Sequence, residues 1–597
     1  MHNLAPRTSI PEPHTVAAAD TTTLDDLDQA LRRIHSYAEI RLFIAGTANF
    51  GHQASSVDLL LRLVGDYAYA GLVTVVYDEG NPGCGLNVEK LPRLLPRYMH
   101  GDGPGPDGLP RQMHAATVQW FPLQDFARPE SDSHAAGSRS KLVDFGLTGG
   151  AEIGRVYRCS LADMLNVRTA LKAQPFQWPW CRDGLDFHSS SRLAPIDLLS
   201  GDRLGSRLFH TAYRLPSTVT TQSSCPRPRP EGCGHDQEND SFLRRLLAAR
   251  APPVDDTWTS LSCVYGLRQT NGVSQIEPAN LLYIYIVALL EGATTRFPKP
   301  SGKDDESPHR TRGPRILVLN FDKFWADAFA RLQDYLHGRH GSPSPHSTSR
   351  NRGSTLPTSG NLSTCVRCIH RLEQLPDALD WFQEQSPRPH VAETPGVPAA
   401  AHRWTNTGVR ILYAHVGFVS PEAFLEALQQ ANLPIIFEGQ HTASAVASLG
   451  KPYLKLQDSV LQCPTQVMRI PDDMHRHSDV IARIQDASLS LQSGALGDTA
   501  FEQSVDSVAS LVAECADSES QLNAYLDHLR SFYQQRGQDK FEQLLRAWNR
   551  FACLQRPERM SDSDAEAAAR RRRMPRMVEE VVLDVENVRK MLAEFGL

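Results

Sequence analysis

The sequence predicts an α/β protein with two Rossmann-like domains facing a central cleft, together with C-terminal helices and disordered surface insertions. The pattern apolar strand, glycine loop, helix occurs twice, at 41–64 and at 433–449. In open parallel sheets such loops lie at the carboxyl ends of strands, where ligands bind. With 597 residues, 41% of them hydrophobic, the chain is large enough for two or three cores.

The first loop follows the apolar run 41–45 and contains Gly46, Asn49, Gly51, His52 and Gln53. Residues 55–64 then carry apolar side chains at helical spacing, and the apolar run 71–78 ends in an acid, Asp78. This order predicts a βαβ unit of a doubly wound sheet. The glycine spacing differs from G-x-G-x-x-G, which argues against a nicotinamide cofactor.

His52 stands at the mouth of the first predicted strand. An imidazole has an ordinary pKa near ~6.5, so in a cleft it could accept a hydroxyl proton at neutral pH. The alternative is that His52 caps the helix or packs beneath the loop. The sequence leaves both roles open.

The second loop repeats this order. Residues 409–414 read as a strand, 421–431 as a helix with Ser420 as N-cap, and 433–437 as the next strand. A helix over 443–449 is then predicted to end at Gly450. Between strand and helix lies a polar loop with Glu438, Gly439, Gln440, His441 and Thr442. Helix N-termini bind phosphate through backbone N–H groups. Alternatively, Glu438 is a solvated loop acid and Thr442 a simple cap.

Both loops resemble segments of GT-B-fold glycosyltransferases, and the pattern is similar to that of the peptidoglycan N-acetylglucosaminyltransferase and wider nucleotide-sugar transferases. Gly51-His52 matches a Gly-His pair that ends the family's N-terminal loop. Gly439, Thr442 and the tripeptide 450–452 (Gly-Lys-Pro) keep the spacing of its donor-binding segment. Gln457-Asp458 looks like a polar pair that contacts the donor sugar in the family.

The resemblance implies a metal-independent glycosyltransferase that moves a sugar from a nucleotide-sugar donor to a hydroxyl-bearing acceptor, with no bound cofactor. It implies donor binding in the C-terminal domain and His52 as base on the acceptor side. Where the family carries a ribose-binding Glu, this chain has Ala445. Glu438 could supply that carboxylate, or the donor could be held differently. A sugar-nucleotide epimerase and a non-catalytic GT-B interaction or effector protein are the alternatives.

The predicted organisation has four parts: a flexible N-terminus (1–35), an acceptor domain (36–300), a donor-binding domain (301–480) and a helical region (481–597). The strand 315–320 is expected to begin the second domain. Stretches rich in Gly, Pro, Ser and charge are expected to be surface insertions; they cover 101–108, 129–140, 217–238, 298–313 and 338–360. Residues 143–152 read as a polar loop, and 578–595 as a final helix.

The net charge of −6 argues against general nucleic-acid binding. The start of the chain lacks the pattern of a signal peptide, and the apolar run 281–290 is too short for a bilayer that needs ~20 residues, so a buried helix and a cytoplasmic protein are expected.

Eleven unevenly spaced cysteines fit a reduced compartment, and no metal site is predicted from Cys365 and Cys368. The basic run Arg570, Arg571, Arg572 and Arg573 could contact an anionic membrane, or be a solvated linker.

Overall fold

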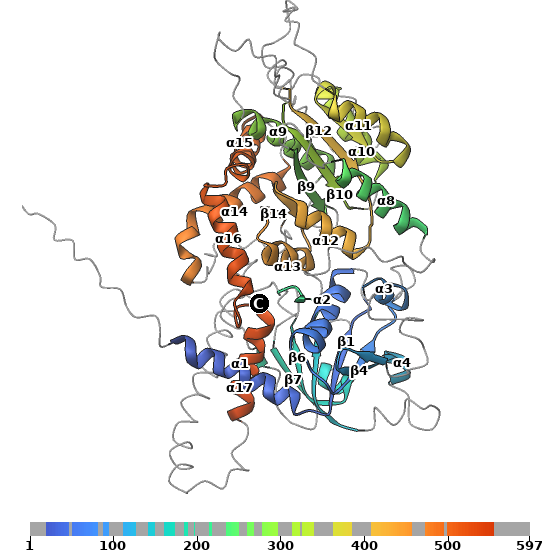
Figure 1. Ribbon diagram of the computed structural model, residues 1–597, viewed down its shortest axis with the longest axis vertical. Coiled ribbons are helices and arrows are strands. Elements are labelled where there is room, and N and C mark those ends of the chain that lie inside the picture. Colours follow the sequence, from blue (N-terminus) through green and yellow to red (C-terminus); the bar gives the residue numbers. More distant parts are fainter. Residues whose placement is uncertain are drawn as a thin grey trace, which may run out of the picture.

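The structure is a computed structural model with two α/β bodies, one built on each of two sheets (Figure 1). It describes residues 19–46, 50–80, 87–94, 111–126, 141–149, 160–173, 184–188, 196–197, 214–217, 234–249, 259–267, 277–296, 313–322, 325–339, 362–384, 408–456, 472–494 and 498–554.

The first sheet has the strand order β3-β4-β2-β1-β5-β6-β7-β8. Its five central strands, from β4 to β6, are parallel, and the outer strands β3, β7 and β8 are antiparallel to their neighbours. The strands are β1 (Glu39–Ile44), β2 (Leu72–Tyr77), β3 (Arg111–Met113), β4 (Ala116–Pro122), β5 (Val143–Thr148), β6 (Val167–Lys172), β7 (Gly184–Phe187) and β8 (Ile196–Asp197). The central strand β1 is buried along its whole length, as expected for a parallel strand covered on both faces.

The second sheet is parallel throughout, in the order β11-β12-β10-β9-β13-β14. Its strands are β9 (Thr259–Tyr265), β10 (Arg315–Asn320), β11 (Val366–Ile369), β12 (Arg410–His415), β13 (Ile435–Phe437) and β14 (Tyr453–Lys455). The predicted α/β class with parallel sheets is therefore confirmed.

Helices connect and cover the strands. Those of the first body are α1 (Ala19–His35), α2 (Phe50–Leu61), α3 (Asn87–Leu94), α4 (Leu123–Phe126) and α6 (Leu161–Leu165). Those that follow are α8 (Gly234–Ala248), α9 (Pro278–Arg296), α10 (Ala326–Leu336), α11 (Leu375–Gln383), α12 (Pro421–Gln430), α13 (Gln440–Leu449), α14 (Ser478–Ser493), α15 (Asp498–Cys515), α16 (Gln521–Gln534) and α17 (Lys540–Leu554). Short helical turns are η2 (Arg62–Asp66), η5 (Leu362–Thr364), η6 (Leu372–Gln374) and η9 (Asp472–His477).

The boundary between the two bodies differs from the predicted division at 300/301. Strand β9 pairs with β10 and β13 at the centre of the second sheet, and the buried residues of α8 and α9 belong to that sheet's hydrophobic core. The chain therefore passes from the first sheet to the second between β8 and α8. The apolar run 281–290 forms the buried part of α9, which confirms the expected core helix. Among the described helices, none has both the length and the apolar composition needed to cross a bilayer.

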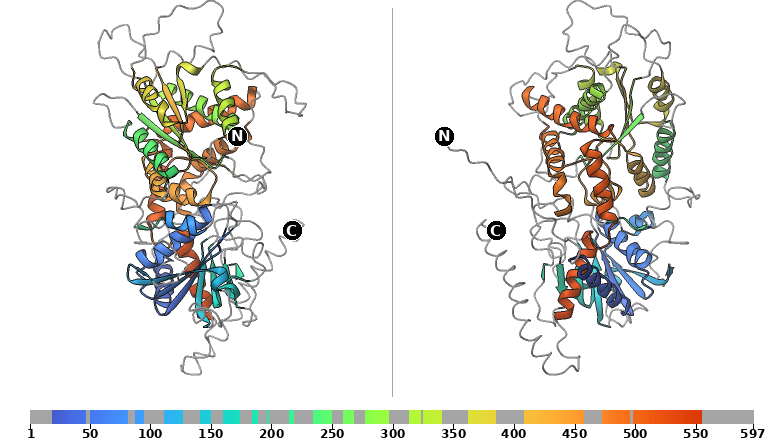
Figure 2. Two further views of the ribbon diagram at one scale, coloured as in Figure 1. Left: turned by 90° about the vertical axis from the view of Figure 1, so that its right-hand side faces the viewer. Right: turned by 60° about the vertical axis from the view of Figure 1, so that its left-hand side comes forward.

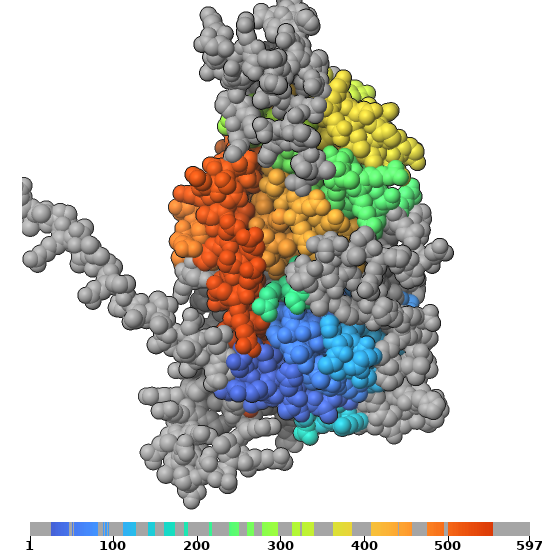
Figure 3. Space-filling model, in the orientation of Figure 1, coloured from blue at the N-terminus to red at the C-terminus, as the bar shows by residue number. Residues whose placement is uncertain are grey.

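The chain returns to the first body through α17, the last helix that the structure describes. Helix α17 packs against α1, and Phe541, Leu544, Leu545 and Trp548 are buried in the core of the first sheet. Figures 2 and 3 show α16 and α17, in red, descending from the second body onto the first. The expectation of a flexible segment over 1–35 is wrong for 19–35, because α1 buries Leu27, Ala30 and Ile34 in this core.

Two further expectations need correction. Residues 143–148 are strand β5 and not a polar loop, since alternate positions carry the buried side chains Val143, Phe145 and Leu147 beside β1. The insertion expected over 217–238 includes the first turns of α8, which begins at Gly234. The other predicted insertions lie almost wholly outside the described residues, as do the final helix over 578–595 and the basic run Arg570–Arg573.

Candidate functional site

The first glycine loop joins β1 to α2, and its two ends are held by packing. A Cβ atom at Gly46 would come within 2.5 Å of the Gly80 backbone, so only glycine fits there without a shift. The buried Gln53 side chain donates from Nε2 to the Ala45 carbonyl oxygen at 3.1 Å, and Asn87 donates to the same oxygen at 3.0 Å. Gly46 and Gln53 therefore shape the loop from within.

The remaining predicted residues of this loop are placed only in part. Asn49 lies outside the described residues. Gly51 and His52 belong to the first turn of α2, but nothing is described of the His52 side chain. The role of His52 as a base thus stays a prediction.

The second glycine loop joins β13 to α13. Gly439 is the N-cap, and the Ala443 N–H donates to its carbonyl oxygen at 3.1 Å. The helix begins at Gln440, three residues earlier than predicted, so Thr442 lies inside the first turn and is not the cap. Glu438 is half-buried beside Gly266, while Thr442 is almost fully buried.

The N-terminus of α13 offers a candidate anion site. The N–H groups of Gln440, His441 and Thr442 occupy the first turn, where a helix has no partners of its own for them. Ala445 is buried in the core of the second sheet, on a face of α13 with no room for a solvated carboxylate. Gln457 and Asp458 lie outside the described residues.

The two helices that the loops open are in contact. Helices α2 and α13 pack together, and the His441 Nδ1 atom lies 3.2 Å from the Asp58 carboxylate oxygen Oδ2. Asp58 is nearly buried on α2, whereas the His441 side chain remains 28% exposed. The second sheet is thus joined, at the carboxyl end of β13, to a helix of the first. A cleft between the loops themselves stays a prediction.

Two opposing effects set the pKa of His441. Burial acts to lower it, while the charge of Asp58 and the hydrogen bond to it act to raise it, and the result is a pKa above the ordinary value. The imidazolium form of His441 is therefore favoured more than in a free histidine. Within the part of the chain that the structure describes, the other ring nitrogen, Nε2, makes no hydrogen bond.

Other polar side chains at the carboxyl ends of the second sheet stabilise its loops. Asp322, after β10, accepts hydrogen bonds from the N–H groups of Gly266 at 2.6 Å and Leu267 at 3.1 Å. Burial lowers the pKa of His415, the last residue of β12, to about 4, so this histidine is neutral at pH 7. Asp322 therefore ties the end of β10 to the end of β9.

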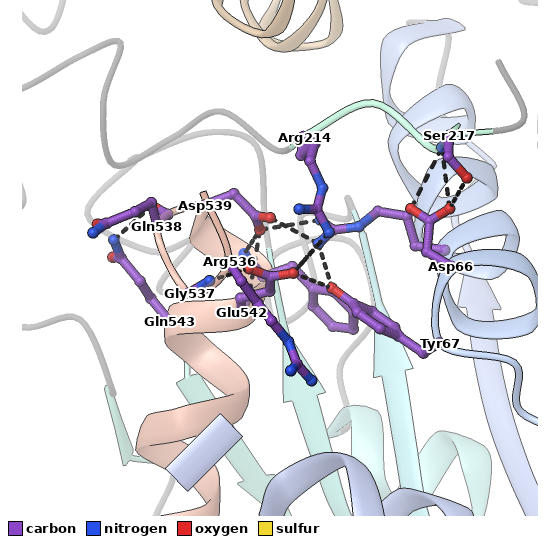
Figure 4. Close-up of polar contacts among 12 residues, drawn as sticks. Asp66, Tyr67, Arg214, Ser217, Arg536, Gly537, Gln538, Asp539, Glu542 and Gln543 are labelled. Carbon is purple, nitrogen blue, oxygen red and sulfur yellow. Dashed lines mark hydrogen bonds and ion pairs between the residues drawn. The ribbon is translucent and has the colours of Figure 1, made fainter. Parts of the chain in front are cut away.

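A buried ionic network ties α17 to the end of α2. Arg62 donates to both carboxylate oxygens of Asp539, at 3.0 and 2.7 Å. Tyr67 donates to Glu542 at 2.8 Å (Figure 4). Arg214 reaches the same Glu542 oxygen at 2.9 Å. Burial acts to lower the pKa of Arg62, but Asp539 and the other partners outweigh it, so Arg62 stays charged.

No cluster of three or more His, Cys, Asp or Glu side chains with metal-binding geometry occurs within the described ranges. Burial raises the pKa of Cys365 and of Cys368 to about 12, so both thiols are protonated at neutral pH. The thiolate form that binds zinc is disfavoured at both positions.

Sequence reasoning missed the pair Asp58–His441. Asp58 stands between Val57 and Leu59 in a run of buried residues, and a single acid in such a run was the available signal. Its partner is more than three hundred and eighty residues away in the chain. Only the packing of α2 on α13 brings the two together.

No protein-family profile matches the sequence, and no curated protein sequence matches it. Solved structures that align with the chain include an apo structure of OtsA, at 11% identity and a TM-score of 0.25, and the α,α-trehalose 6-phosphate synthase of Burkholderia multivorans, at 8% and 0.24. A third is the trehalose-6-phosphate enzyme of E. coli bound with UDP-2-fluoro glucose, at 11% and 0.24. Each alignment covers 83% of this chain and 99% of the other. TM-scores this low carry no argument about fold or activity.

Proposed function

We propose that this protein is a metal-independent glycosyltransferase that moves a sugar from a nucleotide-sugar donor to a hydroxyl-bearing acceptor. The observation that supports it is the contact between α2 and α13, each opened by a glycine loop, with His441 held between them by Asp58. Ligands of open parallel sheets bind at such strand ends. A donor made in the cytosol would place the reaction in the cytoplasm.

In this proposal the donor diphosphate binds at the first turn of α13. The N–H groups of Gln440, His441 and Thr442 and the positive end of the helix dipole offset its charge. The His441 imidazolium adds a positive charge where negative charge develops on the departing diphosphate. Glu438 and the pair Gln457-Asp458 would contact the nucleotide ribose and the sugar.

His52 would act on the acceptor side by accepting a hydroxyl proton. The acceptor is unassigned among protein, lipid and glycan. The basic run Arg570–Arg573 could bring the protein to an anionic membrane surface, where each charge contributes up to ~1 kcal/mol.

The test is donor binding, measured by thermal shift and then by calorimetry with UDP-, GDP- and ADP-sugars. A donor at 100 times its Kd should add about 2.7 kcal/mol to the free energy of unfolding. Because Thr442 is buried, Thr442→Val removes the hydroxyl at nearly constant shape. If that hydroxyl bonds the diphosphate, donor affinity should fall about tenfold or more, since a hydrogen bond to a charged group contributes ~1.5–3 kcal/mol.

Ser444→Ala is the matched control, because it removes a buried hydroxyl from the same helix beyond its first turn. Donor affinity should survive this change even if stability falls. Absence of binding to every nucleotide sugar would refute the proposal. Equal affinities of the Thr442 and Ser444 variants would refute the assigned donor position.

Ala445 favours one second candidate, a non-catalytic GT-B-fold interaction or effector protein, because the resembling transferases have a ribose-binding Glu at that position. The two candidates differ in turnover. Donor that is bound but never transferred or hydrolysed would favour the non-catalytic protein. A sugar-nucleotide epimerase would instead release an epimer of the donor with its nucleotide intact.

A further inference from the structure

A cavity of about 630 Å³ lies between the two bodies, away from the proposed donor site. Its walls come from the end of η2, the segment 214–217, the ends of α12 and α13, and the last turns of α16. Cavities of roughly 300–1,000 Å³ are typical of small-molecule sites. Asp66, Arg214 and Ser217 belong to its lining. Figure 4 shows Ser217 bonded to Asp66, with Arg214 on the same segment as Ser217.

The segment 214–217 fixes this cavity by bonding three separate elements. Arg214 pairs with Glu542 of α17, and the Leu215 N–H donates to Ser448 Oγ of α13 at 3.2 Å. The Ser217 N–H donates to Asp66 Oδ1 at 3.1 Å. The walls from the first and second bodies are therefore linked by hydrogen bonds.

The opposite wall is set by Gly450. This residue ends α13 with φ at +61°, and a Cβ atom there would lie 2.5 Å from the Leu526 carbonyl oxygen and 2.7 Å from Arg530 Cβ. The close approach brings α13 onto α16 and places Lys451 and Arg530 on the same cavity wall. Lys451 is held there by the carbonyl oxygens of Gln429 and Ala431, the latter at 3.0 Å.

The lining carries three cationic side chains, Arg214, Lys451 and Arg530, and one carboxylate, Asp66. Arg214 shares its charge with the buried Glu542. Among the described residues, Arg530 pairs only with Asp527, and both are more than half exposed, so that pair contributes little and leaves most guanidinium donors available. The lining also carries the hydroxyl and amide groups of Ser217, Ser448, Tyr533, Gln429 and Gln534, and the apolar side chains Leu215 and Leu449.

This site is separate from the first turn of α13. Ser448 stands six to eight residues beyond that turn, about 9–12 Å along the helix for a rise of ~1.5 Å per residue, and Lys451 follows the C-cap Gly450. A ligand in the cavity could therefore bind while the donor is bound. The inference does not depend on the proposed transfer activity.

We propose that the cavity is a second binding site, which takes a small phosphorylated polyol such as a sugar phosphate. Arg530 and Arg214 bond the phosphate, because guanidinium groups match its oxygens with paired donors. The hydroxyl and amide groups bond the polyol. Because the ligand touches walls from both bodies, it stabilises their arrangement relative to the unliganded protein.

The test is calorimetry on the full chain with ribose 5-phosphate, with ribose and inorganic phosphate as the two partial ligands. Ribose 5-phosphate should bind saturably and raise the melting temperature. Each partial ligand should bind at least tenfold more weakly. Arg530→Ala should weaken ribose 5-phosphate binding about tenfold, and Arg530→Glu should abolish it.

Arg483→Ala is the matched control, since Arg483 is a similarly exposed arginine that pairs with Glu514 and lies outside the cavity. It should leave binding unchanged, as should Thr442→Val at the proposed donor site. No saturable binding at millimolar ribose 5-phosphate would overturn the inference. Binding of inorganic phosphate as tight as that of ribose 5-phosphate, or unchanged binding by Arg530→Glu, would overturn it as well.

Discussion

At the scale of single residues, the pair Asp58–His441 gives the contact between the two bodies a dependence on pH. The carboxylate raises the pKa of His441 against the opposing effect of burial. In the unfolded chain the histidine pKa is near ~6.5. A group whose pKa is raised by folding stabilises the folded state below its unfolded pKa, and that contribution is lost as pH rises through the folded pKa.

We therefore expect Asp58→Asn to lower the free energy of unfolding more at pH 6 than at pH 9. Urea denaturation of the wild type and the variant at both pH values measures the difference. In a chain that already carries His441→Gln, adding Asp58→Asn should lower the free energy of unfolding by a similar amount at pH 6 and pH 9. A larger cost at pH 9 than at pH 6 would show that the pair does not act in this way.

A second residue-scale prediction concerns His52. If it is the general base, His52→Ala should lower kcat by about 10²–10⁴ with little change in donor affinity, because its bond to the acceptor proton develops in the transition state. The readout is turnover of the donor, including slow hydrolysis, beside donor calorimetry. His337→Ala, at an exposed histidine that ends α10, is the control. A fall in melting temperature with near-normal turnover would assign His52 to packing.

At the scale of elements, α17 is the helix that closes the first body. It supplies Phe541, Leu544, Leu545 and Trp548 to the core, and Trp548 lies 4.6 Å from Phe145 of β5 between ring centroids. The turn η2 widens the end of α2 into a π-helix, in which the Tyr67 N–H donates to the Arg62 carbonyl oxygen at 2.8 Å. That turn places Arg62 and Tyr67 against Asp539 and Glu542.

Arg62→Met tests this contact. It keeps an unbranched, apolar stem but leaves Asp539 buried without its guanidinium partner, and breaking a buried ion pair in this way costs about 3–5 kcal/mol. Arg483→Ala, which breaks the partly exposed pair with Glu514, should cost about 1 kcal/mol or less. Chemical denaturation measures both. If both variants lose a similarly small amount of unfolding free energy, the network does not hold α17 in place.

At the scale of the whole molecule, the chain builds the first body, then the second, and returns to the first through α17. The first core therefore includes residues from 27 to 548. Loop closure over such a span costs little more than over a shorter one, because its entropy grows with the logarithm of length. Burial of the apolar face of α17 offsets that cost.

The local pattern of the sequence was sufficient for five of the fourteen described strands, β1, β2, β10, β12 and β13. The predicted strand over 315–320 is β10, and the strand over 409–414 is β12 shifted by one residue. Continuous apolar runs predicted buried parallel strands because each such strand is covered on both faces. The predicted N-cap Ser420 is confirmed, since its side chain accepts from the Ala423 N–H.

Of the candidate site, the sequence was sufficient to locate the two glycine loops but not the contacts that hold them. Glycine positions located the turns after β1 and β13. The N-cap at Gly439 is a local requirement, whereas the close approach at Gly46 is to the distant Gly80. The sequence did not reveal that Gln53 is a buried support of its loop, because its acceptor, Ala45, is defined by the fold of the turn. The predicted roles of His52, Gln457 and Asp458 remain predictions.

By itself the sequence determined the α/β class, the parallel strands and the position of both glycine loops, because each depends on side chains that are neighbours along the chain. Tertiary structure decided which sheet β9 joins, that α1 and α17 complete the first core, and that Asp58 meets His441. It also decided where the cavity lies, between segments from four distant parts of the chain. These features depend on contacts between residues hundreds of positions apart, and periodicity and spacing contain no information about which distant faces will be buried together.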